Sequence, residues 1–198
     1  MITTARANAI LTTEYPDGDL LSLHTAYSLT GASEVTGGTY ARQACTYSAA
    51  SARARAIAAT ESFTGLPASC TVAWIGTWDS AGTTFKGMSP NGGSEKSFQV
   101  DLTNNRIYCE GHGMVDTDRV TFQGGTLPTN ITEGAHLYVV TTTAGDPDYF
   151  QVSLTSGGAA IDITTSQPSA DATVSKIVLE TYTSAGGTHN VTALSHAL

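Results

Sequence analysis

Hydrophobic and polar positions alternate in short runs through the second half of the chain, and Gly, Pro, Asn or Asp bounds each run. A period of two residues indicates half-buried β-strands, and the frequent turn residues are typical of a small sandwich or barrel. No run of helical length and period lies between these segments, which argues against alternating strands and helices. The predicted strands span residues 98–103, 106–110, 118–122, 136–142, 148–154, 160–164 and 173–182.

The pattern of the first half predicts one helix followed by strands. Residues 3–13 are the helical candidate, since Thr3 or Thr4 can cap the segment and its apolar residues fall on one face. The Ala-rich stretch 48–60 is compatible with a helix or a loop, and we favour a loop that leads into a strand centred on Ile57. The other predicted strands span residues 20–25, 40–47 and 69–78.

Two polar, Gly-rich stretches, 87–97 and 183–187, divide the chain. We expect a host domain of residues 1–90 plus 184–198 and an inserted module of residues 95–182, because inserted domains leave and re-enter a host at neighbouring surface points. The C-terminal strand would then return to complete the first sheet. The predicted fold class is mainly β, with two small antiparallel β-sandwich or barrel domains and a short N-terminal helix.

Composition and charge exclude several kinds of partner. The 198 residues carry a formal net charge of −8 and only nine Lys and Arg side chains. A nucleic-acid partner is not expected, because binding to phosphates needs a basic stripe that this chain lacks. A membrane partner is not expected either. The first fifteen residues lack the apolar stretch of a signal peptide, and no apolar run approaches the ~20 residues of a membrane span, so we expect synthesis in a cytoplasm.

Sequence motifs for catalysis are absent, since the chain has no nucleophile elbow, P-loop, HExxH or paired-Cys pattern. We therefore expect no enzymatic activity and no cofactor. One loop has two interpretations, a metal site or a turn with solvated carboxylates, and its glycines favour the turn. The residues in question are Glu110, His112, Asp116 and Asp118. Isolated cysteines are expected to be free and half-buried, and a disulfide, including one between subunits, is the alternative. They are Cys45, Cys70 and Cys109.

Several stretches of the first half resemble a recurrent family of tailed-phage virion proteins, which includes tail-fibre, minor tail and head-associated proteins. The stretches are LSLHTA (21–26), GASEVTGGTYARQA (31–44), FTGLPASCTVAWIGTWDSAGTTF (63–85) and the closing GTHNVTALSHAL (187–198). The family pattern has Gly-Leu-Trp-Asp at a strand end, whereas this chain has Gly-Thr-Trp-Asp at residues 76–79. Residues 112–122, 124–140 and 148–164 are similar to a separate β module that recurs in phage tail and capsid-decorating proteins.

The resemblance implies a structural component of a tailed-phage virion, first of all a capsid-associated decoration or minor capsid protein. A tail or neck protein is the first alternative, and a carbohydrate-binding module for host adhesion is the second. The implied partners are other virion proteins and further copies of the chain, with a homotrimer as the first choice by analogy with three-fold sites. A host-surface glycan is a further possible ligand, and the implied location is the virion.

Four residues of the resembling stretches are candidates for a structural or interface role: Glu34, Arg42, Tyr40 and Trp78. Glu34 and Arg42 are the plausible ion pair of the Gly-rich loop and could tie it to the following strand. The two aromatic residues could anchor a subunit contact, and core packing explains them as well. His24, within an apolar strand, is expected to be a core histidine with a satisfied ring nitrogen rather than a ligand.

Overall fold

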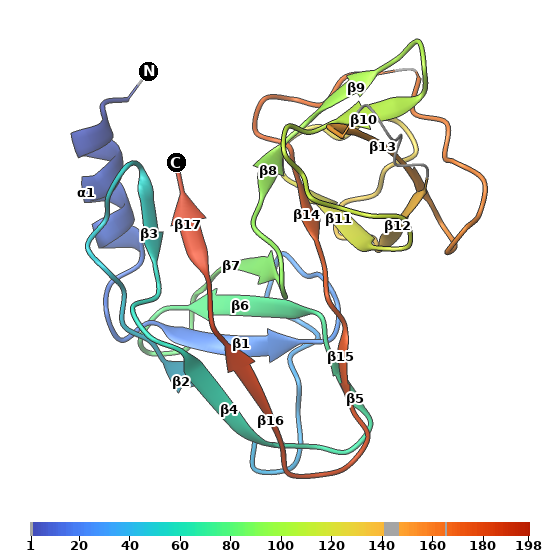
Figure 1. Ribbon diagram of the computed structural model, residues 1–198. Helices are drawn as coiled ribbons and strands as arrows, with labels where there is room; N and C mark the ends of the chain where they lie inside the picture. The colour runs from blue at the N-terminus through green and yellow to red at the C-terminus, as the bar shows by residue number, and fades with distance from the viewer. Residues whose placement is uncertain (1, 141–146, 165) are drawn as a thin grey trace. The chain divides into compact units, whose positions relative to one another are not determined.

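The computed structural model describes residues 2–140, 147–164 and 166–198, and the chain divides into two compact units (Figure 1). Unit 1 comprises Met1–Asn91 and Leu179–Leu198, and unit 2 comprises Gly92–Val178. The predicted fold class is confirmed, since the structure is mainly antiparallel β with one short helix. The second boundary differs from the expected one: the last residues of the predicted module, 180–182, pair within unit 1.

Unit 1 begins with the predicted helix, α1 (Thr4–Glu14). Thr3 is its N-cap, because the Thr3 hydroxyl accepts a hydrogen bond from the backbone N–H of Arg6 at 3.3 Å. Ala7 and Leu11, one turn apart, are the buried residues of the helix. The helix therefore packs by one apolar face, and its contacts include strand β3 (Ala54–Ala56).

A four-stranded antiparallel sheet in the order β2-β1-β6-β7 forms the centre of unit 1. Its strands are β1 (Leu20–His24), β2 (Gln43–Ala44), β6 (Trp74–Trp78) and β7 (Phe85–Pro90). Leu21, Leu23 and Ile75 point from one face of the sheet into the hydrophobic core of the unit. The predicted strand 40–47 shortens to two residues, and the predicted strand 69–78 is interrupted at Ala73.

The C-terminal segment runs back along residues 54–72 as three antiparallel ribbons (Figure 1). The sequence instead predicted that this segment would complete the first sheet. The ribbons are β3 with β17 (Ser195–Ala197), β4 (Glu61–Leu66) with β16 (Gly187–Val191), and β5 (Cys70–Val72) with β15 (Glu180–Tyr182). The loop expected over 48–60 is also corrected: it contains β3, and Ile57 forms only an isolated bridge with Tyr47.

Unit 2 is a small barrel built from a sheet in the order β8-β14-β11-β12-β13-β10-β9. Only Phe98 separates β8 from β9 in the chain, so the two ends of this order are one bent strand and the sheet closes on itself. Val120, Phe122, Ile107 and Phe150 are fully buried in its core. The strands are β8 (Lys96–Ser97), β9 (Gln99–Asp101), β10 (Arg106–Tyr108), β11 (Arg119–Gln123), β12 (Leu137–Val140), β13 (Tyr149–Ser153) and β14 (Thr173–Lys176).

The first and last strands of the barrel, β8 and β14, pair with each other in antiparallel orientation. The chain therefore enters and leaves unit 2 at neighbouring points, which is the geometry that an inserted domain needs. Two predicted strands of this unit change. Residues 160–164 form no strand, although Ile161 donates a backbone hydrogen bond to Val152, and residues 141–142 of the run 136–142 lie outside the described residues.

Candidate functional site

The four residues nominated from the sequence lie together in unit 1. The Arg42 guanidinium donates from Nε to both Glu34 carboxylate oxygens, at 3.0 and 3.1 Å, and from Nη2 to Oε2 at 2.7 Å. The Tyr40 hydroxyl donates to Glu34 at 3.1 Å and accepts from the backbone N–H of Leu23 at 2.9 Å. Only 25% of the Arg42 side chain and 18% of the Glu34 side chain are exposed. A charge-assisted fork thus joins Glu34 of the Gly-rich loop to Arg42 just before β2, and Tyr40 links the same carboxylate to strand β1.

Arg42 also binds the far end of strand β6. Its Nη1 donates to the carbonyl oxygen of Gly82 at 2.8 Å, and its guanidinium carbon lies 3.7 Å from the centroid of the Trp78 ring. A cation stacked on an indole face gains electrostatic energy from the ring quadrupole. The hydrogen bonds with Glu34 raise the pKa of Arg42, so the guanidinium stays charged. One side chain therefore holds the loop, the turn after β6 and the Trp78 indole.

A second chain of hydrogen bonds continues from Trp78 across the sheet. Trp78 Nε1 donates to Ser22 Oγ at 2.8 Å, and Ser22 Oγ lies 2.6 Å from His24 Nε2. His24 Nδ1 lies 3.0 Å from the carbonyl oxygen of Ala32, which can only accept, so Nδ1 carries the proton and Nε2 accepts from Ser22. Burial lowers the pKa of His24, which keeps the ring neutral. His24 is thus a core histidine with both ring nitrogens bonded.

Two glycines make room for this cluster. Ser22 is opposite Gly76 in the β1–β6 ladder, and a Cβ on Gly76 would lie 2.5 Å from His24 Nε2. Gly31 has φ +74°, and a Cβ there would lie 2.4 Å from the Trp78 ring. The roles of Ser22 and Gly76 were not predicted from the sequence. The available signal was the i, i+2 spacing of Ser22 and His24, which places both side chains on one face of a strand.

The cluster of Ser22, His24, Glu34, Tyr40, Arg42 and Trp78 is called the Arg42 cluster below. The polar group of each of these side chains is hydrogen-bonded to a partner inside unit 1. A cavity of about 510 Å³ adjoins Glu34 and Cys70, but the Glu34 carboxylate is already bound. Burial raises the pKa of Cys70, which disfavours the nucleophilic thiolate. The chemistry of this region is therefore that of a structural clamp.

In the loop considered for metal binding, the side chains of His112 and Asp118 bind other protein groups. His112 Nδ1 accepts from the backbone N–H of Met114 at 2.9 Å, and burial lowers the His112 pKa. Asp118 pairs with Lys176 at 2.7 Å and accepts from the N–H of Val115. Within residues 2–140, 147–164 and 166–198, no group of three or more His, Cys, Asp or Glu side chains is arranged to hold a metal ion.

All three cysteines are free and buried, and they lie in different parts of the fold. Cys45 and Cys70 belong to the core of unit 1, and Cys109 belongs to the core of unit 2. Burial raises the pKa of each thiol, so each behaves as a small hydrophobic side chain. The disulfide alternative within one chain is therefore wrong for this structure.

Comparison of the chain with protein-family models, curated proteins and solved structures yields no match. The helical part of the described chain contains no segment that is long and apolar enough to cross a bilayer. Function is therefore inferred from the residues and from the geometry of the two units.

Proposed function

We propose that the protein is a structural component of a tailed-phage virion, as a capsid-associated decoration or minor capsid protein that acts through subunit contacts. The observation that carries the proposal is the Arg42 cluster. The residues of this cluster come from the LSLHTA, GASEVTGGTYARQA and GTWD stretches, on which the phage resemblance rests. A motif whose polar groups are all bonded inside the chain stabilises a scaffold, whereas a catalytic motif leaves reactive groups open to a substrate.

The ribbons of unit 1 offer surfaces suited to contacts between subunits. On β4 and β16, the Ser62 hydroxyl donates to Asn190 Oδ1 at 2.8 Å, and on β5 and β15 the Thr71 and Thr181 hydroxyls lie 3.0 Å apart. These cross-strand pairs are small, uncharged and already hydrogen-bonded. Covering them with another subunit costs little desolvation energy compared with burying charged side chains. Such surfaces support association by shape, and the proposed homotrimer rests on analogy with the three-fold sites of capsid decoration and fibre attachment.

Quantitative mass spectrometry of particles tests the location. Particles would be purified by density gradient from a lysate of the host that carries the gene. A decoration protein should copurify at a copy number close to that of the major capsid protein, and a neck or tail protein at a far lower one. Absence of the chain from purified particles would overturn the virion assignment as a whole.

Light scattering of the isolated protein tests the proposed assembly. We expect a trimer, and we expect Asn190→Arg to dissociate it by placing a charge on the β4–β16 ribbon. Thr103→Arg is the matched control, because Thr103 is exposed in a turn of unit 2. A wild-type monomer at high concentration would contradict the homotrimer, and a trimer in both variants would exclude the ribbon as its contact surface.

A further inference from the structure

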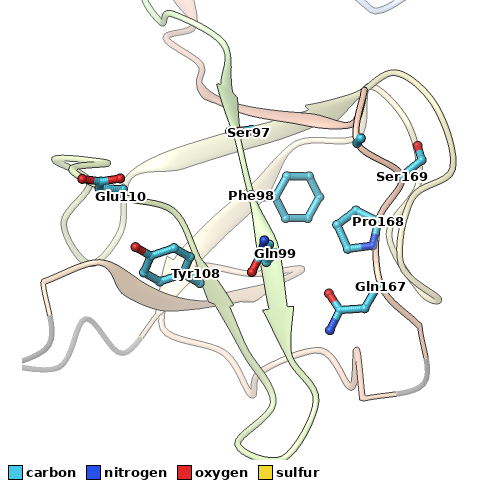
Figure 2. A pocket seen from close by; sticks show the side chains of 9 residues that line it. Ser97, Phe98, Gln99, Tyr108, Glu110, Gln167, Pro168 and Ser169 are labelled. Carbon is cyan, nitrogen blue, oxygen red and sulfur yellow. The ribbon is translucent and has the colours of Figure 1, made fainter. Parts of the chain in front are cut away.

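A cavity of about 620 Å³ lies in unit 2 at the seam of the barrel (Figure 2). The bent strand pairs with β14 through Ser97 and with β10 through Gln99, and Phe98 between them has no ladder partner. Because the strand changes neighbours at Phe98, β14 and β10 diverge and leave an opening between them. Figure 2 shows Tyr108 and Glu110 on one side of this opening and Gln167, Pro168 and Ser169 on the other.

The walls of the cavity are held in place by contacts on both sides. The Gln167 side chain accepts from the backbone N–H of Val100 at 3.0 Å and donates to the Val100 carbonyl oxygen, so it substitutes for a neighbouring strand on the open side of β9. On the opposite wall, the Tyr108 ring packs on Tyr149 with ring centroids 5.1 Å apart. The guanidinium of Arg106 lies 3.9 Å from the centroid of the Tyr149 ring. The site is therefore preformed, as small-molecule sites commonly are.

Three side chains in the cavity have polar groups that form no hydrogen bond within the described part of the chain. They are the Gln99 amide, the Tyr108 hydroxyl and the Glu110 carboxylate. Phe98 and Pro168 add apolar surface between and beside them. The cavity thus combines an aromatic wall with an amide donor, a hydroxyl and a carboxylate acceptor. Its volume lies in the ~300–1,000 Å³ range of ligand pockets.

We propose that this cavity binds one neutral sugar ring, as a glycan-recognition site of unit 2. The apolar face of a pyranose packs against Tyr108, while its hydroxyls donate to Glu110 and exchange hydrogen bonds with Gln99. Anionic ligands are disfavoured, because none of the lining residues is cationic and the chain carries a net charge of −8. Glu110 is the only carboxylate among the lining residues, whereas glycoside hydrolysis needs a pair, so the site binds and does not cleave.

Protein-observed NMR with the ¹⁵N-labelled full chain tests this site. The probes are D-glucose, D-galactose and N-acetyl-D-glucosamine, each titrated well beyond the ~1 mM dissociation constant typical of a ligand with few contacts. At least one sugar should give saturable shifts at the amides of Gln99, Tyr108 and Glu110. Tyr108→Ala and Glu110→Ala should each weaken binding about tenfold or more, since each removes one of few contacts.

Matched variants keep the test independent of folding. Tyr138→Ala removes a partly exposed tyrosine of β12 that does not line the cavity, and it should leave sugar binding unchanged. If Tyr108→Ala disturbs the spectrum of the whole barrel, Gln99→Ala replaces it, because the exposed Gln99 side chain forms no hydrogen bond among the residues that the structure describes. Absence of saturable shifts with all three sugars would overturn the proposal. Preferential binding of inorganic phosphate, N-acetylneuraminate or choline at these residues would overturn the neutral-sugar assignment.

Discussion

Replacing Arg42 by Met tests whether the Arg42 cluster stabilises unit 1. The substitution keeps most of the side-chain length but removes the fork to Glu34, the bond to Gly82 and the cation over Trp78. Hydrogen bonds between charged groups contribute ~1.5–3 kcal/mol each, and a partly exposed cation–π contact contributes ~0.5–1 kcal/mol. Partial exposure of both charged partners lowers the first figure, because water screens the pair. We expect a loss of about 3 kcal/mol in the free energy of unfolding.

Urea unfolding followed by tryptophan fluorescence measures this loss in unit 1 alone. The two tryptophans of the chain, Trp74 and Trp78, both belong to unit 1, so unfolding of unit 2 does not enter the signal directly. Urea is preferable to guanidinium chloride, because a salt would screen the charges under study. A double-mutant cycle with Glu34→Gln should give a coupling energy of about 1–2 kcal/mol between residues 34 and 42.

Arg6→Met is the matched control, since Arg6 loses the same charge but lies exposed on α1 and uses its side chain in no hydrogen bond among the described residues. Its effect should stay within ~0.5 kcal/mol. The reasoning would be refuted if Arg42→Met were no more destabilising than Arg6→Met. A coupling energy near zero would show that the fork to Glu34 does not contribute.

Three further predictions follow from the described contacts. Gly31→Ala should destabilise unit 1 by about 2–3 kcal/mol in the same assay, because it combines backbone strain at φ +74° with a clash against the Trp78 ring. The control Gly186→Ala should cost only about 1 kcal/mol, because Gly186 has φ +83° but no neighbour within 4 Å of an added Cβ. Equal effects of the two variants would contradict the clash. Burial lowers the pKa of His196 from 6.5 to about 4, so the unfolded chain binds more protons in this window and stability should fall as the pH drops from 6.5 to 4. His196→Phe, which can keep the stack on Tyr15, should reduce the pH slope of the urea midpoints across that window, and an unchanged slope would refute this assignment. Residues 92–178 expressed alone should fold, because the barrel closes on itself, and an unfolded wild-type fragment would contradict this independence. Phe98→Ala removes a buried ring and should destabilise the fragment by ~3–5 kcal/mol in thermal unfolding followed by circular dichroism.

The sequence was sufficient for the fold class and for most strands of unit 2, because alternation of polar and apolar residues is a local property. It was insufficient for pairing partners. The apolar run 173–182 was predicted as one strand, but Thr173–Lys176 pairs in unit 2 and Glu180–Tyr182 pairs with β5 in unit 1. Periodicity alone carries no information about which neighbour a strand meets, so the domain boundary inside this run was hidden.

The candidate residues of unit 1 were found because ionic and aromatic side chains are conspicuous in a chain with only 13% charged residues. Glu34, Arg42, Tyr40 and Trp78 indeed contact one another or share a partner. The roles of Ser22 and Gly76 could not be predicted, because they depend on the register that sets Ser22 opposite Gly76. A one-residue shift of β6 against β1 would turn Gly76 to the other face of the sheet, away from Ser22 and His24.

The barrel seam shows how one strand can both close a sheet and open a cavity. A strand pairs with neighbours on its two edges, and the bent strand of unit 2 does so with two separate short segments, Lys96–Ser97 and Gln99–Asp101. Closure leaves unpaired edges only on the short segments β8 and β9, and the Gln167 side chain covers part of the edge of β9. The bend at Phe98 separates β14 from β10, and the Gln167 amide satisfies the backbone of Val100 that a strand would otherwise pair with. The cavity is therefore a consequence of closure with short strands, and its position depends on pairing that no local pattern in the sequence encodes.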